Sequence, residues 1–370
     1  MTLAAAFHMN GNPVVLGDLL MSGSADGQPS TLKLPAAGPN QSLLNHDRTL
    51  EAKYLRQKIV IVSPNCAFAV AGTAGDVVEC IKELRTMTKR PLTRDGVQKY
   101  LHGLEVHGLN PDAELVGYVA EGDQLALLGA RCERLSAFSP DSRDMFVAGS
   151  GASKMQQLLP SLQTEVRQLI AGKGDGPQAI MRAAQIGALF LDVEWDGGGT
   201  LADSFGGGYE VAYYDGHQFA KLRDITYCLW DASYNEREDH LRFGLRLVMK
   251  QHYAGDILMV RSLRCEASPK DERKIESIDS QFQYIFPIDG NNAARALPGR
   301  EEMPAGSPVS AHCIRVPGTS TLEFKQRTFL IAMTGDREPA ITLEESRTNG
   351  TLIKVSGEFF ARLKNELRKK

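Results

Sequence analysis

The chain has 370 residues, of which 42% are hydrophobic and 24% are charged, and its formal net charge is −3. This is the composition of an ordinary globular protein that can bury one large core or two smaller ones. The small negative charge gives no argument for binding nucleic acid or an anionic membrane. No apolar run approaches a membrane span, and the start lacks the layout of a secretory signal, so we expect a cytoplasmic protein.

The six cysteines and eight histidines show no metal-ligand spacing, and there is no Cys-x-x-Cys pair. We therefore expect reduced core cysteines, no metal site and no cofactor.

The first eighteen residues predict a β-hairpin that returns the chain to its own N-terminus. Leu3, Ala5 and Phe7 fall on one side of a period-two pattern, which suits a strand with one buried face. A turn at 10–13 leads to a second apolar run. The hairpin should therefore bring Asp18 close to Thr2.

The middle of the chain shows the pattern of hairpins and pairs of helices. Residues 21–57 are rich in turn-forming and polar residues and are interpreted as an excursion from the core sheet. The order of the elements indicates an α/β arrangement rich in antiparallel hairpins, not a βαβ series. The predicted elements are a hairpin at 58–70, helices at 76–84 and 97–104, a hairpin at 115–128, a strand at 145–148, helices at 152–170 (kinked or divided at Pro160) and 177–190, a loop at 195–200 and a hairpin at 209–222.

Two glycine runs, 197–199 and 206–208, lack the spacing and the strand–turn–helix setting of a phosphate loop. We interpret both runs as flexible walls near a cleft.

The last third of the chain has mostly strand-like segments separated by polar loops. The sequence therefore predicts one domain at 1–235 and a β-rich extension at 236–370 that ends in a short helix. The strand-like segments are 241–249, 257–260, 282–286, 322–324 and 329–333, and the helix is placed around 359–367.

Thr2 gains a possible chemistry if Met1 is removed, which a small second residue permits. An N-terminal threonine carries a nucleophile, its hydroxyl, and a base, its α-amine, in one residue. The amine titrates near about pH 7.7–8.0, close enough to neutrality to accept the hydroxyl proton. Many chains begin Met-Thr without such chemistry, so Thr2 needs partners to carry a hypothesis.

Landmarks along residues 1–235 supply those partners, and together they resemble the proteasome β-subunit and HslV family of N-terminal nucleophile (Ntn) hydrolases. Each landmark is weak alone, but six in the right order are hard to dismiss. They are Thr2, Gly17-Asp18, Lys58, Ala71-Gly72 followed by Gly75-Asp76, Gly149-Ser150-Gly151, and Asp203-Ser204.

The resemblance implies an α+β fold, a four-layer αββα sandwich of two antiparallel sheets between helix layers, with the β-rich extension added. It implies that the Thr2 hydroxyl attacks a peptide carbonyl with its own amine as base. Lys58, held by Asp18 as an ammonium, would stabilise the deprotonated hydroxyl.

The resemblance also assigns supporting roles. The Gly72 amide would donate to the developing oxyanion, and Ser150 and Asp203 would orient the terminal amine. Val70 would form the floor of the substrate pocket and favour an apolar residue before the cleaved bond.

Two departures from the family pattern leave alternatives open. The excursion at 21–57 precedes the lysine strand, so Lys33 and Lys53 remain rivals of Lys58. Gly206 stands where the family usually has a serine, so one hydrogen bond to the terminal amine is missing or supplied by water.

The resemblance implies a threonine peptidase within a homo-oligomeric ring, acting on unfolded protein or peptides. It leaves open the number of subunits and whether an ATPase partner exists. Two other hypotheses are an Ntn amidase acting on a small amide and a ring or scaffold subunit without activity. The last gains weight if Met1 is retained.

Overall fold

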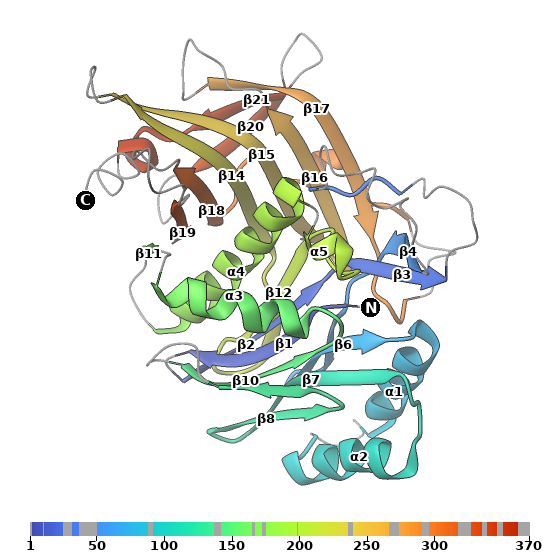
Figure 1. The fold of residues 1–370 in the computed structure, drawn as a ribbon. Helices are drawn as coiled ribbons and strands as arrows, with labels where there is room; N and C mark the ends of the chain where they lie inside the picture. The colour runs from blue at the N-terminus through green and yellow to red at the C-terminus, as the bar shows by residue number, and fades with distance from the viewer. Residues whose placement is uncertain are drawn as a thin grey trace.

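The computed structural model describes a chain built in stacked layers of sheets and helices (Figure 1). From one end to the other these are a nine-stranded sheet, a helix layer, a six-stranded sheet, a four-stranded sheet and a second helix layer. The first helix layer contains α3 (Ala152–Thr164), α4 (Asp175–Gly197) and α5 (Gly199–Ala202), and the second contains α1 (Ala74–Thr86) and α2 (Arg94–His107). The described residues are 2–9, 11–24, 32–36, 50–87, 92–136, 142–164, 167–171, 175–197, 199–235, 240–265, 274–290, 296–316, 327–334, 339–345 and 351–361.

The predicted N-terminal hairpin is confirmed and forms the centre of the six-stranded sheet. β1 (Ala4–Met9) pairs antiparallel with β2 (Asn12–Asp18) on one side and with β10 (Ser142–Ala148) on the other. The full order is β13-β12-β2-β1-β10-β9, where β9 is Glu133–Leu135, β12 is Tyr209–Tyr214 and β13 is Phe219–Lys221.

One buried face was predicted for the first strand, but both faces of β1 are buried. Leu3, Ala5 and Phe7 belong to the core beneath α4, whereas Ala4 and Ala6 pack toward the four-stranded sheet. The two faces of β1 are therefore buried against two different neighbours, with the large side chains Leu3 and Phe7 both on the α4 side.

The four-stranded sheet packs face to face on the six-stranded one. It contains β5 (Ile59–Ser63), β6 (Cys66–Gly72), β7 (Ala113–Glu121) and β8 (Gln124–Ala130), in that order. Alanine is the commonest residue in the core between the two sheets, and such small side chains let the sheets approach closely. The outer face is covered by α1 (Ala74–Thr86) and α2 (Arg94–His107), as the sequence predicted.

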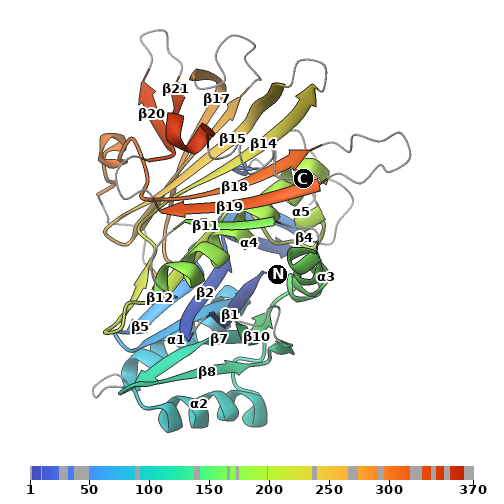
Figure 2. The ribbon, with the colours of Figure 1, turned by 90° about the vertical axis from the view of Figure 1, so that its left-hand side faces the viewer.

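The nine-stranded sheet is strongly curved and covers the side of α4 that faces away from the six-stranded sheet (Figure 2). Its order is β11-β19-β18-β14-β15-β16-β17-β21-β20. The strands are β11 (Arg167–Ala171), β14 (Asp224–Asn235), β15 (His240–Ala254), β16 (Ile257–Cys265), β17 (Lys274–Ile285), β18 (Val309–Val316), β19 (Arg327–Thr334), β20 (Ile341–Glu345) and β21 (Thr351–Val355). The short segment η3 (Arg300–Glu302) and a two-stranded sheet of β3 (Leu20–Ser24) and β4 (Leu50–Leu55) complete the described elements.

The predicted four-layer αββα sandwich is wrong. The chain is mostly β, and α4 (Asp175–Gly197) does not belong to an outer layer. It contacts β2 and β12 on one side and β14, β18 and β19 on the other, so a further sheet covers it. All ten residues 181–190 are buried. Apart from Arg182 and Gln185, these ten residues are apolar or glycine. A helix that is apolar on most of its sides belongs inside a protein, and that signal was present in the sequence.

Several predicted boundaries also differ from the structure. The helix predicted at 152–170 ends earlier, as α3 (Ala152–Thr164), and is followed by β11. The loop predicted at 195–200 is helical, because α4 continues to Gly197 and α5 (Gly199–Ala202) follows. Residue 235, the predicted domain boundary, is the last residue of β14, which pairs with β15; the division into two domains stays a prediction. The segment 322–324 and the end of the predicted terminal helix lie outside the described residues.

Within the described residues, none of the helices combines the length and apolar character needed to cross a lipid bilayer.

Candidate active site

Thr2, Asp18 and Lys58 meet at the end of the N-terminal hairpin. The Lys58 Nζ lies 2.6 Å from the Thr2 Oγ1 and 2.8 Å from the Asp18 Oδ1. All three residues are buried, with Thr2 1% exposed and the other two 0%. The hairpin places Asp18 beside Thr2, as predicted, because the Asp18 amide donates to the Leu3 carbonyl oxygen over 3.0 Å. Of the three rival lysines, Lys58 is the one at Thr2.

Backbone amides hold the Asp18 carboxylate in place. Its Oδ1 accepts from the Leu3 amide at 2.9 Å, and its Oδ2 accepts from the amides of Gly206 at 2.9 Å and Leu20 at 3.2 Å. Burial raises the pKa of Asp18, and Lys58 and the amides oppose that rise. Burial likewise lowers the pKa of Lys58, with Asp18 opposing. Burial therefore brings the two pKa values closer together, which eases proton movement between these groups.

The three acceptors around Lys58 fit both of its protonation states. Besides Asp18 and the Thr2 hydroxyl, Nζ contacts the Leu20 carbonyl oxygen. A carbonyl oxygen and an ionised carboxylate can only accept hydrogen bonds, so two of the amine protons point at Leu20 and Asp18. The third position, facing Thr2, holds a proton in the ammonium and a lone pair in the neutral amine. The Thr2 hydroxyl can accept from the first and donate to the second, so the pair can exchange a proton without moving.

The backbone of Lys58 is fixed by Glu210, a buried residue of β12. The Glu210 Oε2 accepts from the Lys58 amide at 2.6 Å and from the Ile59 amide at 3.2 Å. Its Oε1 accepts from the Lys221 Nζ at 2.8 Å and from the Tyr253 hydroxyl. Tyr253 lies on β15, so the nine-stranded sheet helps to position the lysine.

The second glycine run is buried and ordered by hydrogen bonds, so its interpretation as a flexible wall is wrong. Gly206 donates to Asp18, and the Gly207 amide donates to the Glu194 Oε2 over 3.0 Å. Gly206 has φ +132°, and a Cβ there would lie 2.3 Å from the Glu194 Oε2. A side chain at position 206 would therefore meet a buried carboxyl group, so the position needs glycine.

Glu194 itself has a strongly perturbed acidity. Burial raises its pKa to about 8, and the nearby Asp18 charge adds to the rise, while the Gly207 amide opposes it. At neutral pH this carboxyl group therefore keeps its proton in most molecules.

The turn at 149–151 wraps the main chain of Thr2. The Gly151 amide donates to the Thr2 carbonyl oxygen over 3.0 Å, and the Ser150 hydroxyl donates to the Asp203 carbonyl oxygen over 2.5 Å. The structure thus joins the two predicted orienting residues, through the main chain of Asp203. Their role toward a terminal amine stays a prediction.

Gly72 and Val70 lie at the end of β6. Gly72 has φ +106°, and a Cβ would lie 1.5 Å from the Asp112 carbonyl oxygen, so no other residue fits. Its oxyanion role stays a prediction. The Val70 amide bonds to the Lys58 carbonyl, but its buried side chain packs in the core under α1 and α2. The structure therefore does not bring the Val70 side chain to Thr2.

Lys33 and Lys53 lie elsewhere. Lys33 lines a separate cavity against the nine-stranded sheet, and the Lys53 side chain packs at Gly23 within the two-stranded sheet.

Sequence reasoning missed Glu194 and Glu210. Glu210 carried a signal, a charge inside the apolar strand Tyr209–Tyr214. Glu194 lay beyond the predicted end of its helix.

Among the described residues there is no group of three or more His, Cys, Asp and Glu side chains that could hold a metal ion. Neither the protein-family models nor the curated proteins with which the sequence was compared gave a match.

Proposed function

We propose that this protein is an N-terminal threonine hydrolase, a peptidase similar in its chemistry to proteasome β-subunits, in which Thr2 is the nucleophile after Met1 is removed. The observation that carries the proposal is the buried Lys58 amine, 2.6 Å from the Thr2 hydroxyl and 2.8 Å from Asp18. A buried charge pair costs desolvation energy. The Lys58–Asp18 pair is in contact with the Thr2 hydroxyl, which fits a chemical role better than a stabilising one.

The proposed reaction has two steps. First, the Thr2 Oγ bonds to the substrate carbonyl carbon while its proton passes to Lys58 or to the freed α-amine; the proton then moves to the departing amine as the amide bond breaks. Second, water attacks the resulting ester, which releases the carboxylic acid and restores the hydroxyl. Lys58 serves both steps because the side of its Nζ that faces Thr2 holds a proton in the ammonium and a lone pair in the neutral amine.

Intact mass is the first test. The mature protein should lack Met1, because that residue occupies the Thr2 nitrogen as an amide; a retained methionine would count heavily against the proposal.

Covalent labelling is the second test. A peptide boronate or β-lactone should add to Thr2, and the adduct should be absent in Thr2→Ala. Lys58→Met should slow labelling about 10²–10⁴-fold, the usual contribution of a positioned base. Lys250→Met is the matched control. Lys250 is also 0% exposed, but it lies on β15 in the nine-stranded sheet and donates a hydrogen bond to Ser307. Equal labelling rates in the two lysine variants, both folded by circular dichroism, would refute the role of Lys58.

An amidase acting on a small substrate is the second candidate. It is favoured by the burial of Thr2, which is 1% exposed in the chain that begins with Met1. Turnover of a panel of peptides and of small amides by the processed protein separates the two candidates. If the processed protein hydrolyses neither class and takes up no label, the remaining reading is a scaffold without activity.

Assembly into a homo-oligomeric ring in the cytoplasm is proposed on the family resemblance alone. Native mass spectrometry tests it, and a monomer at micromolar concentration would remove the idea of a closed chamber. Whether an ATPase feeds such a ring stays open.

A further inference from the structure

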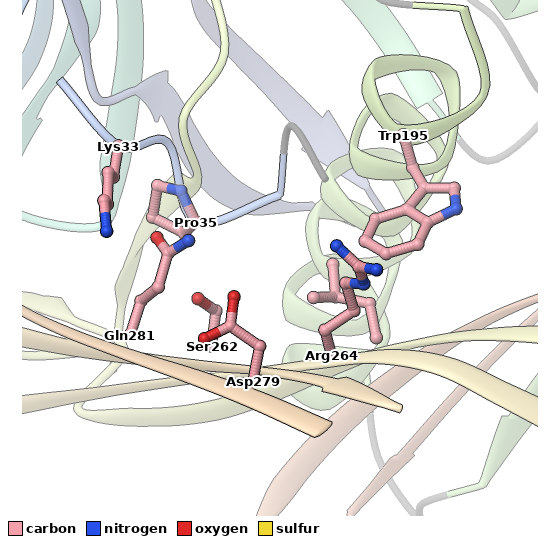
Figure 3. Close-up of a pocket in the computed structure, with 8 residues that line it drawn as sticks. Lys33, Pro35, Trp195, Ser262, Arg264, Asp279 and Gln281 are labelled. Carbon is pink, nitrogen blue, oxygen red and sulfur yellow. The ribbon is translucent and has the colours of Figure 1, made fainter. Parts of the chain in front are cut away.

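A small cavity of about 180 Å³ lies between the nine-stranded sheet and the end of α4 (Figure 3). Trp195, near the end of α4, forms one wall, and Lys33 and Pro35 border the opposite part. The residues of the Thr2 site do not line it. The cavity is thus a separate feature of the molecule.

The floor of the cavity consists of two cross-strand pairs on β16 and β17. Ser262 lies opposite Gln281, and Arg264 lies opposite Asp279. Directly opposed residues of antiparallel strands project from the same face, so four polar side chains converge here. Figure 3 shows the Arg264 guanidinium beneath the Trp195 ring and the Asp279 carboxylate beside Ser262.

These polar groups have few partners within the protein. The Gln281 Oε1 is buried and accepts no hydrogen bond from the described residues. Among the residues that the structure describes, the side chains of Ser262, Arg264 and Asp279 form no hydrogen bond or ion pair. Buried polar atoms are nearly always hydrogen-bonded in native proteins. The buried Gln281 Oε1 and the buried Ser262 side chain, next to the exposed charges of Arg264 and Asp279, therefore indicate a ligand site.

The charges around the cavity indicate the ligand. Lys33 and Arg264 are cations, and among the described residues that line the cavity Asp279 is the one carboxylate. A complementary ligand carries two negative groups and one positive group. The volume is below the roughly 300–1,000 Å³ of pockets for drug-sized molecules, so the ligand is about the size of a single amino acid.

We propose that this cavity binds a free acidic α-amino acid. Arg264 holds one carboxylate through paired N–H groups, the geometry that guanidinium favours. Asp279 accepts from the α-ammonium, Lys33 faces the second carboxylate, and Gln281 and Ser262 complete the hydrogen bonds. The ligand carbons lie against the Trp195 ring.

Tryptophan fluorescence offers a direct assay, because the chain has only two tryptophans. Trp230 is 0% exposed and packed in a separate core cluster, so a ligand in this cavity should perturb Trp195 alone. L-glutamate or L-aspartate should change the fluorescence with saturation, and Trp195→Phe should abolish the change. Titration calorimetry on the same protein measures the Kd independently.

Three comparisons test the assignment of groups. L-glutamine should bind at least tenfold more weakly than L-glutamate, because it lacks the second charge. Asp279→Asn should raise the Kd for glutamate about tenfold, the loss of one charge-assisted hydrogen bond, and leave the Kd for glutarate, which has no ammonium, unchanged. Glu276→Gln, on the same strand but outside the cavity, is the matched control and should change neither.

The proposal fails if neither fluorescence nor calorimetry detects the acidic amino acids at millimolar concentration. It also fails if glutamine binds as tightly as glutamate, or if Asp279→Asn weakens glutarate as much as glutamate. None of these results depends on the reactivity of Thr2.

Discussion

Replacing Glu194 with glutamine should remove a loss of stability that the wild-type protein suffers as pH rises. Glu194 is fully buried beside Gly206 and Gly207, and its pKa is raised from 4.5 to about 8, chiefly by burial. Glutamine keeps an oxygen that can accept from the Gly207 amide but cannot ionise. The variant therefore isolates the effect of charge.

The sign and size follow from proton linkage. Between pH 4.5 and 8 the folded chain keeps a proton on Glu194 that the unfolded chain releases, so the free energy of unfolding falls as pH rises. Each pH unit inside that window costs about 1.36 kcal/mol. From pH 5.5 to 7.5 the wild type should thus lose about 2–3 kcal/mol relative to Glu194→Gln.

Urea denaturation of both proteins at several pH values from 5.5 to 7.5 measures this difference. Taking wild type minus variant cancels the other titrating groups. Glu79→Gln, an exposed glutamate of α1, is the control and should give a flat difference. If the difference for Glu194→Gln is also flat across this range, then the carboxyl group is not held neutral and the reasoning is wrong.

Three further predictions concern single side chains. Gly206→Ala should lower the free energy of unfolding by about 1–3 kcal/mol, because φ is +132° and the new Cβ would meet Glu194; an unchanged urea midpoint would contradict this. Lys250 has a pKa lowered by burial to about 8, so the folded wild type sheds a proton that the unfolded chain keeps up to about pH 10.5, and from pH 8.5 to 10 stability should rise by about 2 kcal/mol. Lys250→Met should abolish that rise, and an equal rise in the variant would disprove it. Thr93→Ala should lower the free energy of unfolding in urea by about 1 kcal/mol, because the Thr93 hydroxyl caps α2 by accepting from the Gly96 amide. Thr93→Ser should keep the cap, and an alanine variant as stable as the serine variant would show that the cap does not stabilise the protein.

Local patterns were enough to predict the N-terminal hairpin and the helices α1 and α2. Turn residues fix where β1 and β2 begin, and the register of a hairpin follows from its turn. The closeness of Asp18 to Thr2 is therefore a local property. Lys58 is different, since no pattern within its own strand distinguishes it from Lys33 or Lys53, and its position at Thr2 was reached only through the spacing in a family.

Other features that sequence reasoning missed depend on long-range contacts. β14 pairs in parallel with β18, more than seventy residues later, and β11 pairs in parallel with β19. Nothing in the strand patterns specifies such partners. The contact between Gly206 and Glu194 depends in turn on how α4 is covered by that sheet.

The position of α4 between two sheets has a consequence for synthesis on the ribosome. One of its faces is covered by β18 and β19, and β19 begins at residue 327, 130 residues after α4 ends at 197. At about 5–20 residues per second, that face waits roughly 6–26 s for its cover. During this interval a largely apolar helix face is open to solvent and to other nascent chains, so the yield of native protein should depend on chaperone capacity and on translation speed across this interval.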